Sequence, residues 1–381
     1  MKRRIALQAL SMGAVVPGWV NANTNSAYKA DVILLGQTAD FSASRAAISQ
    51  AYSAGAQLVF EQTNAVGGVF GRPIQVVTLD DAYNIEKAQT NAKKLVEESQ
   101  IFALVHGVGT AIAEKVIPYT ELLGVPHIHP LTGADHVRPP LLPSKNTFFL
   151  RASYGREIER IVSQLKTLGI TQVALVHEDE SFGKAIRALL EKAMQAQGMQ
   201  LSAVGVLPFN APDNVNAAVQ TVIKKQPTAI IVGSAGASVD NFIAAYHASG
   251  ERAQYYCLSI CNIERLYKTL GPRSAGIVVT QVMPSLEKSS MAVVRDYQAM
   301  ALDKKLAPSG FGLEGFISAR IIVQALTKSG PQLSRQKFAA ALANPVSRQL
   351  GGFPIQRAAN SRTGSPFVDL ALLNTNGKLI F

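Results

Sequence analysis

The chain has only two cysteines, one tryptophan and 17% charged residues among its 381 residues, whereas 48% of the residues are hydrophobic. This composition excludes a disordered chain, because disordered segments are poor in apolar residues. Beyond the N-terminus there is no run of the ~18 uncharged apolar residues that a membrane-spanning helix needs. We therefore expect a globular body, and the length is sufficient for two domains of ordinary size.

The two cysteines, Cys257 and Cys261, lie in a segment of strand-like composition. If the strand continues through both, their Cα atoms lie ~13 Å apart, which is well beyond disulfide reach. We expect two buried free thiols. A metal site would need more nearby ligands than these, and the six histidines are scattered. Neither a metal nor a cofactor is expected.

Patterns typical of nucleic-acid binding or catalysis are also missing. The formal net charge is +11, but no Lys/Arg run has interleaved aromatic residues, so nucleic acid is not an expected partner. Gly107 and Gly109 begin like a dinucleotide-binding loop, but Ile112 stands at the third glycine position. Pro272 replaces the first glycine of a nucleophile elbow around Ser274. We expect no enzyme activity, and an exported α/β enzyme is the rival from another functional class.

Residues 1–22 have the order of a secretory signal peptide. Three basic residues (Lys2, Arg3 and Arg4) precede an apolar region that ends near Val20, and cleavage is expected after Ala22. The adjacent arginines leave open whether export uses the general or the twin-arginine route. The mature protein is expected in the periplasm.

Short apolar segments alternate with amphipathic segments along the chain. Strands are expected near residues 31–36, 74–79, 101–106 and 125–129, with helices at 46–64, 85–99 and 110–123. A second series of strands follows at residues 172–176, 201–206, 229–232 and 255–258. This doubled pattern predicts an α/β fold of two doubly wound, parallel-sheet lobes. Helices near 292–304, 312–328 and 335–342 would return to the first lobe, so that several chain crossings form a hinge.

Two neighbouring strands of the first lobe are followed by loops that contain a threonine and a glycine. Gly109 and Thr110 follow the strand at 101–106, and Thr132 and Gly133 follow the strand at 125–129. Ligands of open α/β sheets lie outside the carboxyl ends of the strands, where helix N-termini attract anions. The loops therefore predict a cradle for a small anionic or polar group. The alternative is that both threonines only cap helices, with Thr110 as an N-cap.

Several motifs then resemble a known family. Residues 64–74 contain Gly67, Gly68 and Gly71 before a strand, Gly124-Val125-Pro126 follows later, and residues 178–183 read Glu-Asp-Glu-Ser-Phe-Gly. Nearly the whole mature chain resembles the type I periplasmic binding proteins of the branched-chain amino acid (Leu/Ile/Val) class, the solute receptors of ABC importers. The resemblance implies two lobes joined by a three-strand hinge and ABC permease subunits as partners. We expect residues 29–150 plus 282–351 in lobe 1, residues 151–281 plus 352–381 in lobe 2, and a monomer.

The resemblance also implies ligand-binding positions. Gly109 with Thr110 and Thr132 with Gly133 match the loops that hold a ligand carboxylate, and Phe182 matches an aromatic residue that covers the ligand. The other implied contacts are Phe41 and Ser42 in the first binding loop, Tyr154 at the first crossing, and Ser234, Ala235, Cys261 and Asn262 in lobe 2.

The chain differs from the amino-acid-binding members of this class at two acidic positions. Tyr154, Gly155 and Arg156 stand in the first region and Cys261 and Asn262 in the second, so only Glu157 could pair with a ligand ammonium. A buried ammonium without a counter-charge costs several kcal/mol. The hypothesis is therefore a carboxylate ligand that need not be an α-amino acid; branched-chain or other amino acids and aromatic or aliphatic acids all fit.

Two questions stay open at this point. Arg45, Arg151 and Arg156 are each candidates for a further anion anchor. The function that the resemblance implies is solute delivery to an importer, and a ligand-sensing receptor for a signalling partner is the alternative.

Overall fold

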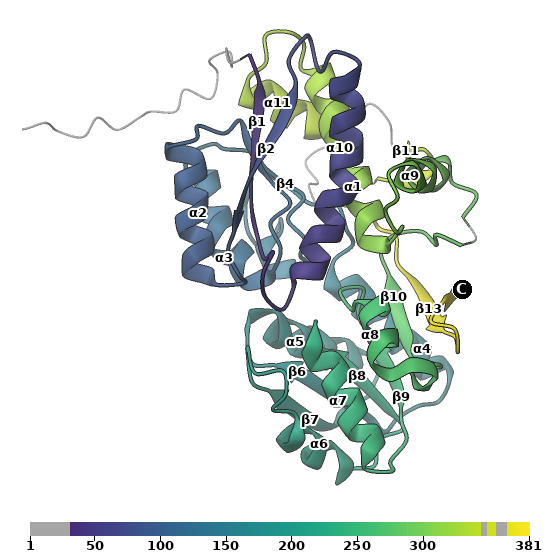
Figure 1. The fold of residues 1–381 in the computed structure, drawn as a ribbon. Coiled ribbons are helices and arrows are strands. Elements are labelled where there is room, and N and C mark those ends of the chain that lie inside the picture. The colour runs from purple at the N-terminus through teal and green to yellow at the C-terminus, as the bar shows by residue number, and fades with distance from the viewer. Residues whose placement is uncertain (1–30, 288, 344–348, 356–363) are drawn as a thin grey trace, which may run out of the picture.

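The computed structural model describes residues 31–287, 289–343, 349–355 and 364–381. The expected signal peptide lies outside the described residues. The chain forms two α/β lobes, one above the other in Figure 1, and segments from different parts of the sequence connect them. Among the described residues, none of the helices combines the length and the apolar character needed to span a membrane.

Lobe 1 is built on a five-stranded parallel sheet with strand order β2-β1-β3-β4-β5. The strands are β1 (Ile33–Ala39), β2 (Ile74–Asp80), β3 (Ala103–Val105), β4 (His127–Ile128) and β5 (Thr147–Phe148). The helices between them are α1 (Ala46–Ala65), α2 (Ile85–Glu97), α3 (Thr110–Leu122) and the short 3₁₀ helix η1 (Asp135–Val137). β1 and β3 are almost entirely buried, as expected for parallel strands covered by helices on both faces.

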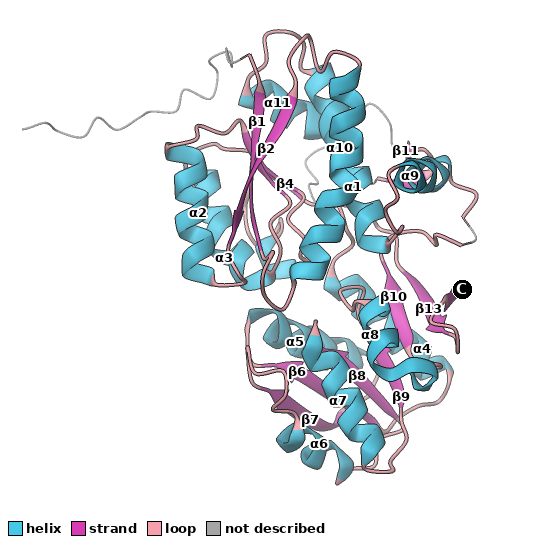
Figure 2. Cartoon of the chain, in the orientation of Figure 1, coloured by secondary structure: helices cyan, strands magenta, loops and turns pink. Residues whose placement is uncertain are grey.

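Lobe 2 repeats this arrangement in a seven-stranded sheet of order β14-β13-β10-β9-β8-β6-β7, in which β13 and β14 are antiparallel. The strands are β6 (Val173–Glu178), β7 (Leu201–Leu207), β8 (Ala229–Gly233), β9 (Gln254–Cys257), β10 (Val278–Gln281), β13 (Asp369–Leu373) and β14 (Leu379–Ile380). The helices are α4 (Tyr154–Thr167), α5 (Ser181–Ala196), α6 (Asn216–Ile223), α7 (Ala237–Ala248), α8 (Ile263–Leu270) and the 3₁₀ helix η2 (Gly271–Ser274). The predicted fold class of two doubly wound lobes is confirmed (Figure 2).

After β10 the chain returns to lobe 1 as α9 (Ala292–Asp303), α10 (Gly310–Lys328) and α11 (Arg335–Ala343). α10 packs so closely on α1 that a Cβ atom on Gly55 would clash with the Gly312 carbonyl, and one on Gly315 with the Tyr52 carbonyl. β11 (Gln349–Leu350) and β12 (Phe353–Pro354) then pair with each other. Phe353 still packs in the core around α1 and α10, although the sequence places the last crossing between residues 351 and 352.

Both sheets reverse their strand order at equivalent places, between β1 and β3 in lobe 1 and between β6 and β8 in lobe 2. Such a switch point opens a crevice outside the carboxyl ends of the strands. The two switch points face each other, because the loop after β1 contacts the end of β6 through Arg45 and Glu178. One hydrophobic cluster continues across this boundary and includes Leu131 of lobe 1 and Phe182 of lobe 2.

Two local predictions are wrong. Gly109, with a φ of 115°, is the N-cap of α3, and Thr110 is the first helical residue without a side-chain cap bond. The strand expected to continue through Cys261 ends at Cys257, and a turn follows in which Cys261 N donates to Leu258 O at 2.9 Å. The extended spacing of ~13 Å assumed for the two cysteines therefore does not apply. Both cysteines are nevertheless free and buried, as expected.

Candidate functional site

The two threonine loops of lobe 1 meet at the switch point. The hydroxyl oxygens of Thr110 and Thr132 lie 2.8 Å apart in a hydrogen bond, and both side chains are buried. Val108 and Leu131 form a parallel bridge that brings the loops into register. The two hydroxyl groups are therefore directed at each other in this closed arrangement.

Aromatic rings lie directly on the glycines of these loops. A Cβ atom on Gly109 would overlap the ring of Tyr83, and one on Gly133 would overlap the ring of Tyr154. The ring of Tyr154 in turn lies 5.0 Å from that of Phe182 in lobe 2, centroid to centroid. The structure thus brings Gly109, Thr110, Thr132, Gly133, Tyr154 and Phe182 together.

A buried ion pair joins the lobes at the same place. Arg45 Nη2 lies 2.7 Å from Glu178 Oε2, and the two side chains are only 4% and 3% exposed. Arg45 Nη1 donates to the carbonyl oxygen of Ala235 at 2.6 Å, and the guanidinium carbon lies 4.9 Å from the centre of the Tyr83 ring. Ser238 donates its hydroxyl to the other Glu178 oxygen at 3.1 Å. We call this pair with its contacts the interlobe bridge.

Electrostatics at the interlobe bridge favour a charged Arg45. Burial alone would lower its pKa, but the charges of Glu178 and Glu180 and the contact with Tyr83 together outweigh burial and raise the pKa. Glu180 lies nearby as the N-cap of α5 and accepts from Gly183 N at 3.2 Å. Burial, together with the charge of Glu178, raises the pKa of Glu180 to about 7. The carboxyl group of Glu180 therefore changes its protonation state near neutral pH.

The remaining predicted residues near the lobe boundary have separate surroundings. Ser234 follows β8, and its buried hydroxyl has no hydrogen-bond partner among the described residues. Phe41 N and the Ser42 hydroxyl both donate to the carboxylate of Asp80, at 2.8 Å and 2.6 Å. The Ser42 hydroxyl is the main cause of the lowered pKa of Asp80. Asp80 therefore fixes the first predicted binding loop at the rim of lobe 1.

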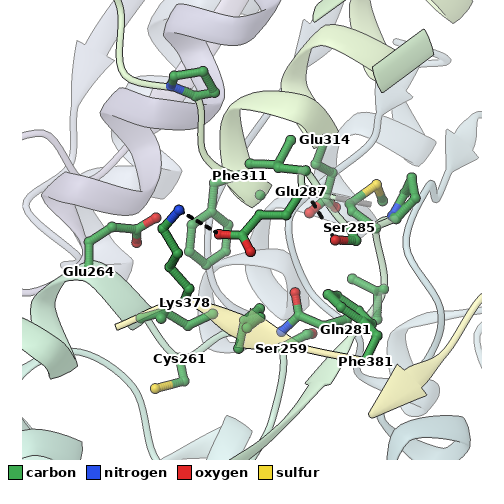
Figure 3. A pocket seen from close by; sticks show the side chains of 18 of the residues that line it. Ser259, Cys261, Glu264, Gln281, Ser285, Glu287, Phe311, Glu314, Lys378 and Phe381 are labelled. Carbon is green, nitrogen blue, oxygen red and sulfur yellow. Dashed lines mark hydrogen bonds and ion pairs between the residues drawn. The ribbon is translucent and has the colours of Figure 1, made fainter. Parts of the chain in front are cut away.

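A cavity of about 310 Å³ lies between the lobes, beside the segments that cross from one lobe to the other. We call it the hinge-side cavity; Figure 3 shows most of its side chains. Lobe 1 provides Gln298, Phe311 and Glu314, lobe 2 provides Ser259, Cys261 and Glu264, and the crossing segments provide Arg151 and residues 281–287. The rest of the lining consists of residues 377–379 and Phe381, around β14, and of Ile263, Pro308 and Gly310.

Two of the predicted lobe 2 positions lie at or next to this cavity. Cys261 lines it, and its contact with Cys257, together with burial, raises the pKa of the Cys261 thiol. Asn262 instead caps α8, because its side chain accepts from Arg265 N at 2.9 Å. Of these two neighbours, only Cys261 lines the cavity.

Buried charged groups surround the inner end of the cavity. Arg151 binds Glu314 through two parallel hydrogen bonds, Nε to Oε1 at 3.1 Å and Nη2 to Oε2 at 3.0 Å, and the side chains are 1% and 2% exposed. Glu157 is fully buried and accepts from Ser259 N at 2.9 Å, from the Ser259 hydroxyl at 3.0 Å and from the Thr280 hydroxyl. Burial raises the pKa of Glu157. The chain itself thus supplies the donors for this carboxylate.

Sequence reasoning missed the interlobe bridge and the cavity. The sequence indicates Arg45 only as one of three candidate anion anchors, and it marks Glu178 only as part of the motif at residues 178–183. The cavity combines residues from as far apart as Arg151 and Phe381. The motif at residues 178–183 was the one signal for Glu178, because it marks the carboxyl end of β6.

Two α/β lobes, with facing switch points and a cavity lined by both, have the architecture of a solute-binding protein. The chain belongs to the periplasmic binding protein family, whose sequence pattern matches residues 32–377. The resemblance to the Leu/Ile/Val-binding class is confirmed by similar proteins.

An amino acid binding protein of Pseudomonas aeruginosa is 23% identical over 335 residues, which cover 84% of this chain and 85% of that protein. A substrate-binding periplasmic protein from Ralstonia solanacearum has 28% identity and a TM-score of 0.84, with 91% of this chain and 99% of that chain covered. A possible leucine/isoleucine/valine-binding protein from Rhodopirellula baltica has 25% identity and a TM-score of 0.86, with 92% and 96% covered.

Proposed function

We propose that this protein is the periplasmic solute-binding component of an ABC importer, and that it closes its two lobes on a small carboxylate-bearing solute. The observation that supports this most directly is the hinge-side cavity, because residues of both lobes and of the crossing segments line it. Its size is at the lower end of the ~300–1,000 Å³ range of ligand pockets. An amino acid or a small aromatic or aliphatic acid is of suitable size.

Closure follows from where the contacts lie. A solute in the cavity contacts Phe311 in lobe 1 and Ser259 in lobe 2 at the same time only when the lobes are together. Its affinity for the closed state therefore exceeds its affinity for the open state, and this difference shifts the population toward closure. An importer permease would then bind the closed form and receive the solute.

The buried acids support a ligand that need not be an α-amino acid. Glu157, Glu178 and Glu314 are each held by donors of the chain. A ligand ammonium would have to displace one of these donors or share a carboxylate with it. The predicted residues Phe41, Ser42, Gly109, Thr110, Thr132, Gly133, Tyr154, Phe182, Ser234, Ala235, Cys261 and Asn262 stay a prediction for ligand contacts; we propose that those at the interlobe bridge form the closing faces.

Calorimetric titration of the mature protein tests the proposal. The panel contains leucine, isoleucine and valine, the acids 4-methylpentanoate and benzoate, and the corresponding amides. At least one carboxylate is expected to bind and, at a hundredfold excess over its Kd, to stabilise the folded protein by about 2.7 kcal/mol. Thermal unfolding measures that gain in stability. Small-angle scattering should show that the radius of gyration with ligand is no larger than the radius of gyration without it.

Two outcomes would contradict the proposal. Chemical conversion of a bound probe, measured by mass spectrometry after incubation, would indicate an enzyme. Failure of every carboxylate to bind would exclude the proposed ligand class. The transport role is tested by uptake of the bound solute in cells with and without the gene.

A further inference from the structure

Arg151 has a guanidinium nitrogen that the chain leaves without a partner. Nε and Nη2 donate to Glu314, but buried Nη1 has no hydrogen-bond partner among the described residues. Buried donors of folded proteins almost always have an acceptor. Since Arg151 lines the hinge-side cavity, a group that enters the cavity can supply that acceptor.

The cavity has a polar inner end, apolar walls and a charged mouth. Phe311 and Met283 are buried wall residues, and Leu286 is half-buried beside them. Lys378 lies at the mouth, where its side chain is 65% exposed and its Nζ lies 3.8 Å from Glu287 Oε1. Figure 3 marks this contact with a dashed line. The arrangement fits a molecule whose apolar body follows an oxygen-bearing head toward Arg151.

The charge balance around Arg151 permits an anionic head. Glu314 compensates Arg151, but Arg138 lies directly behind and donates from its Nη1 to the Arg151 carbonyl oxygen at 3.0 Å. These two buried guanidinium groups balance the two buried carboxylates, Glu157 and Glu314. A carboxylate oxygen on Nη1 accepts a hydrogen bond from a charged donor and adds the attraction between two opposite charges, which a neutral carbonyl oxygen does not supply.

The strand-end threonines, Thr110 and Thr132, are less suited to bind a ligand carboxylate in this closed arrangement. The hydroxyls of Thr110 and Thr132 bond to each other, and the rings of Tyr83 and Tyr154 cover the adjacent glycines. We infer that Arg151 Nη1 anchors the carboxylate of a small aliphatic or aromatic acid within the hinge-side cavity. This inference rests on the proposed binding function. It assigns the ligand carboxylate to the hinge-side cavity and not to the strand-end threonines.

The substitution Arg151→Lys tests the anchor. Lysine keeps a positive charge for Glu314, but its single nitrogen cannot donate to Glu314 and also replace Nη1 as the donor to the ligand carboxylate. Titration with 4-methylpentanoate and benzoate is expected to show affinity lowered by about tenfold or more. Arg160→Lys is the matched control, because Arg160 is exposed on α4, and it should change affinity by less than about twofold. Unchanged affinity in Arg151→Lys would overturn the inference. The variant Thr132→Val tests the strand-end threonines instead, and a loss of affinity in Thr132→Val alone would also overturn the inference.

A second measurement needs no variant and remains decisive should Arg151→Lys fail to fold. Wild-type protein is titrated with each acid and with its amide, 4-methylpentanamide or benzamide. The acid is expected to bind about tenfold more tightly, because both carbonyl oxygens can accept from Nη1 but only the carboxylate adds a negative charge that the guanidinium attracts. An amide that binds as tightly as its acid overturns the carboxylate assignment. If acids, amides and amino acids all fail to bind, the proposed function itself is wrong. If they bind but Arg151→Lys leaves the affinity unchanged, only the assignment of Arg151 is wrong.

Discussion

The interlobe bridge should control how readily the lobes close, and Glu178→Gln is the sharpest perturbation. The variant keeps the shape of residue 178 but leaves the Arg45 guanidinium, 4% exposed, without its counter-charge. Removing one partner of a buried pair costs about 3–5 kcal/mol. Because Arg45 becomes hydrated when the lobes part, the molecule can avoid this cost by opening instead of unfolding.

The magnitude follows from that cost. A change of roughly 1.4 kcal/mol alters an equilibrium constant tenfold, so a cost of about 3–5 kcal/mol should lower the closing equilibrium constant by a factor of about 10² to 4 × 10³. A ligand that binds only the closed state loses apparent affinity in proportion to the closed fraction. Small-angle scattering of the ligand-free variant should show a larger radius of gyration, and calorimetry should show weaker binding of whichever probe the wild type binds.

Asp179→Asn provides the control next to Glu178. Asp179 pairs with Lys184 at 3.0 Å, but its side chain is 57% exposed, so its loss should change closure by no more than about 1 kcal/mol. The reasoning would be refuted if Glu178→Gln matched Asp179→Asn in both radius of gyration and affinity.

Three further changes have defined outcomes. Gly315→Ala should lower the free energy of unfolding by more than about 2 kcal/mol in urea titrations, because the new methyl group meets the Tyr52 carbonyl and overpacks the helix contact. Ser318→Ala should cost about 1–3 kcal/mol in the same assay, since it removes the hydroxyl 2.8 Å from His106 Nε2 and leaves that buried ring nitrogen unpaired. Glu180 has a pKa of about 7 when folded, against roughly 4.5 when unfolded, so its contribution to stability declines as pH rises between these values. Thermal melts of Glu180→Gln should show a smaller decline over that interval than wild type, and an identical slope would contradict the assignment.

The fold was largely predictable because its signals are local. A buried apolar segment followed by an amphipathic one identified β1 with α1 and β2 with α2, and the second series of strands gave two lobes. The errors arose where one residue changed the backbone. Gly109, at a positive φ, took the cap position expected for Thr110, and the turn after Cys257 ended a strand that composition alone would have extended.

The candidate site was predictable only in part, since its decisive contacts are long-range. Thr110 and Thr132 could be paired because parallel strands place their loops at one sheet edge. Arg45 and Glu178 are 133 positions apart and meet only after both lobes have formed and closed. The pairing of Arg151 with Glu314 spans 163 positions, and no periodicity in the sequence indicates it.

The close packing of α1 on α10 has a consequence for the order in which the molecule can assemble. α1 begins at Ala46, but the helix that covers its glycine surface ends only at Lys328, whereas the parallel strands of lobe 2 lie between Val173 and Gln281. During synthesis, the parallel strands of lobe 2 are therefore made before α10, the lobe 1 helix that covers α1. Any protein that shields nascent segments would have to protect the exposed side of α1 for most of synthesis.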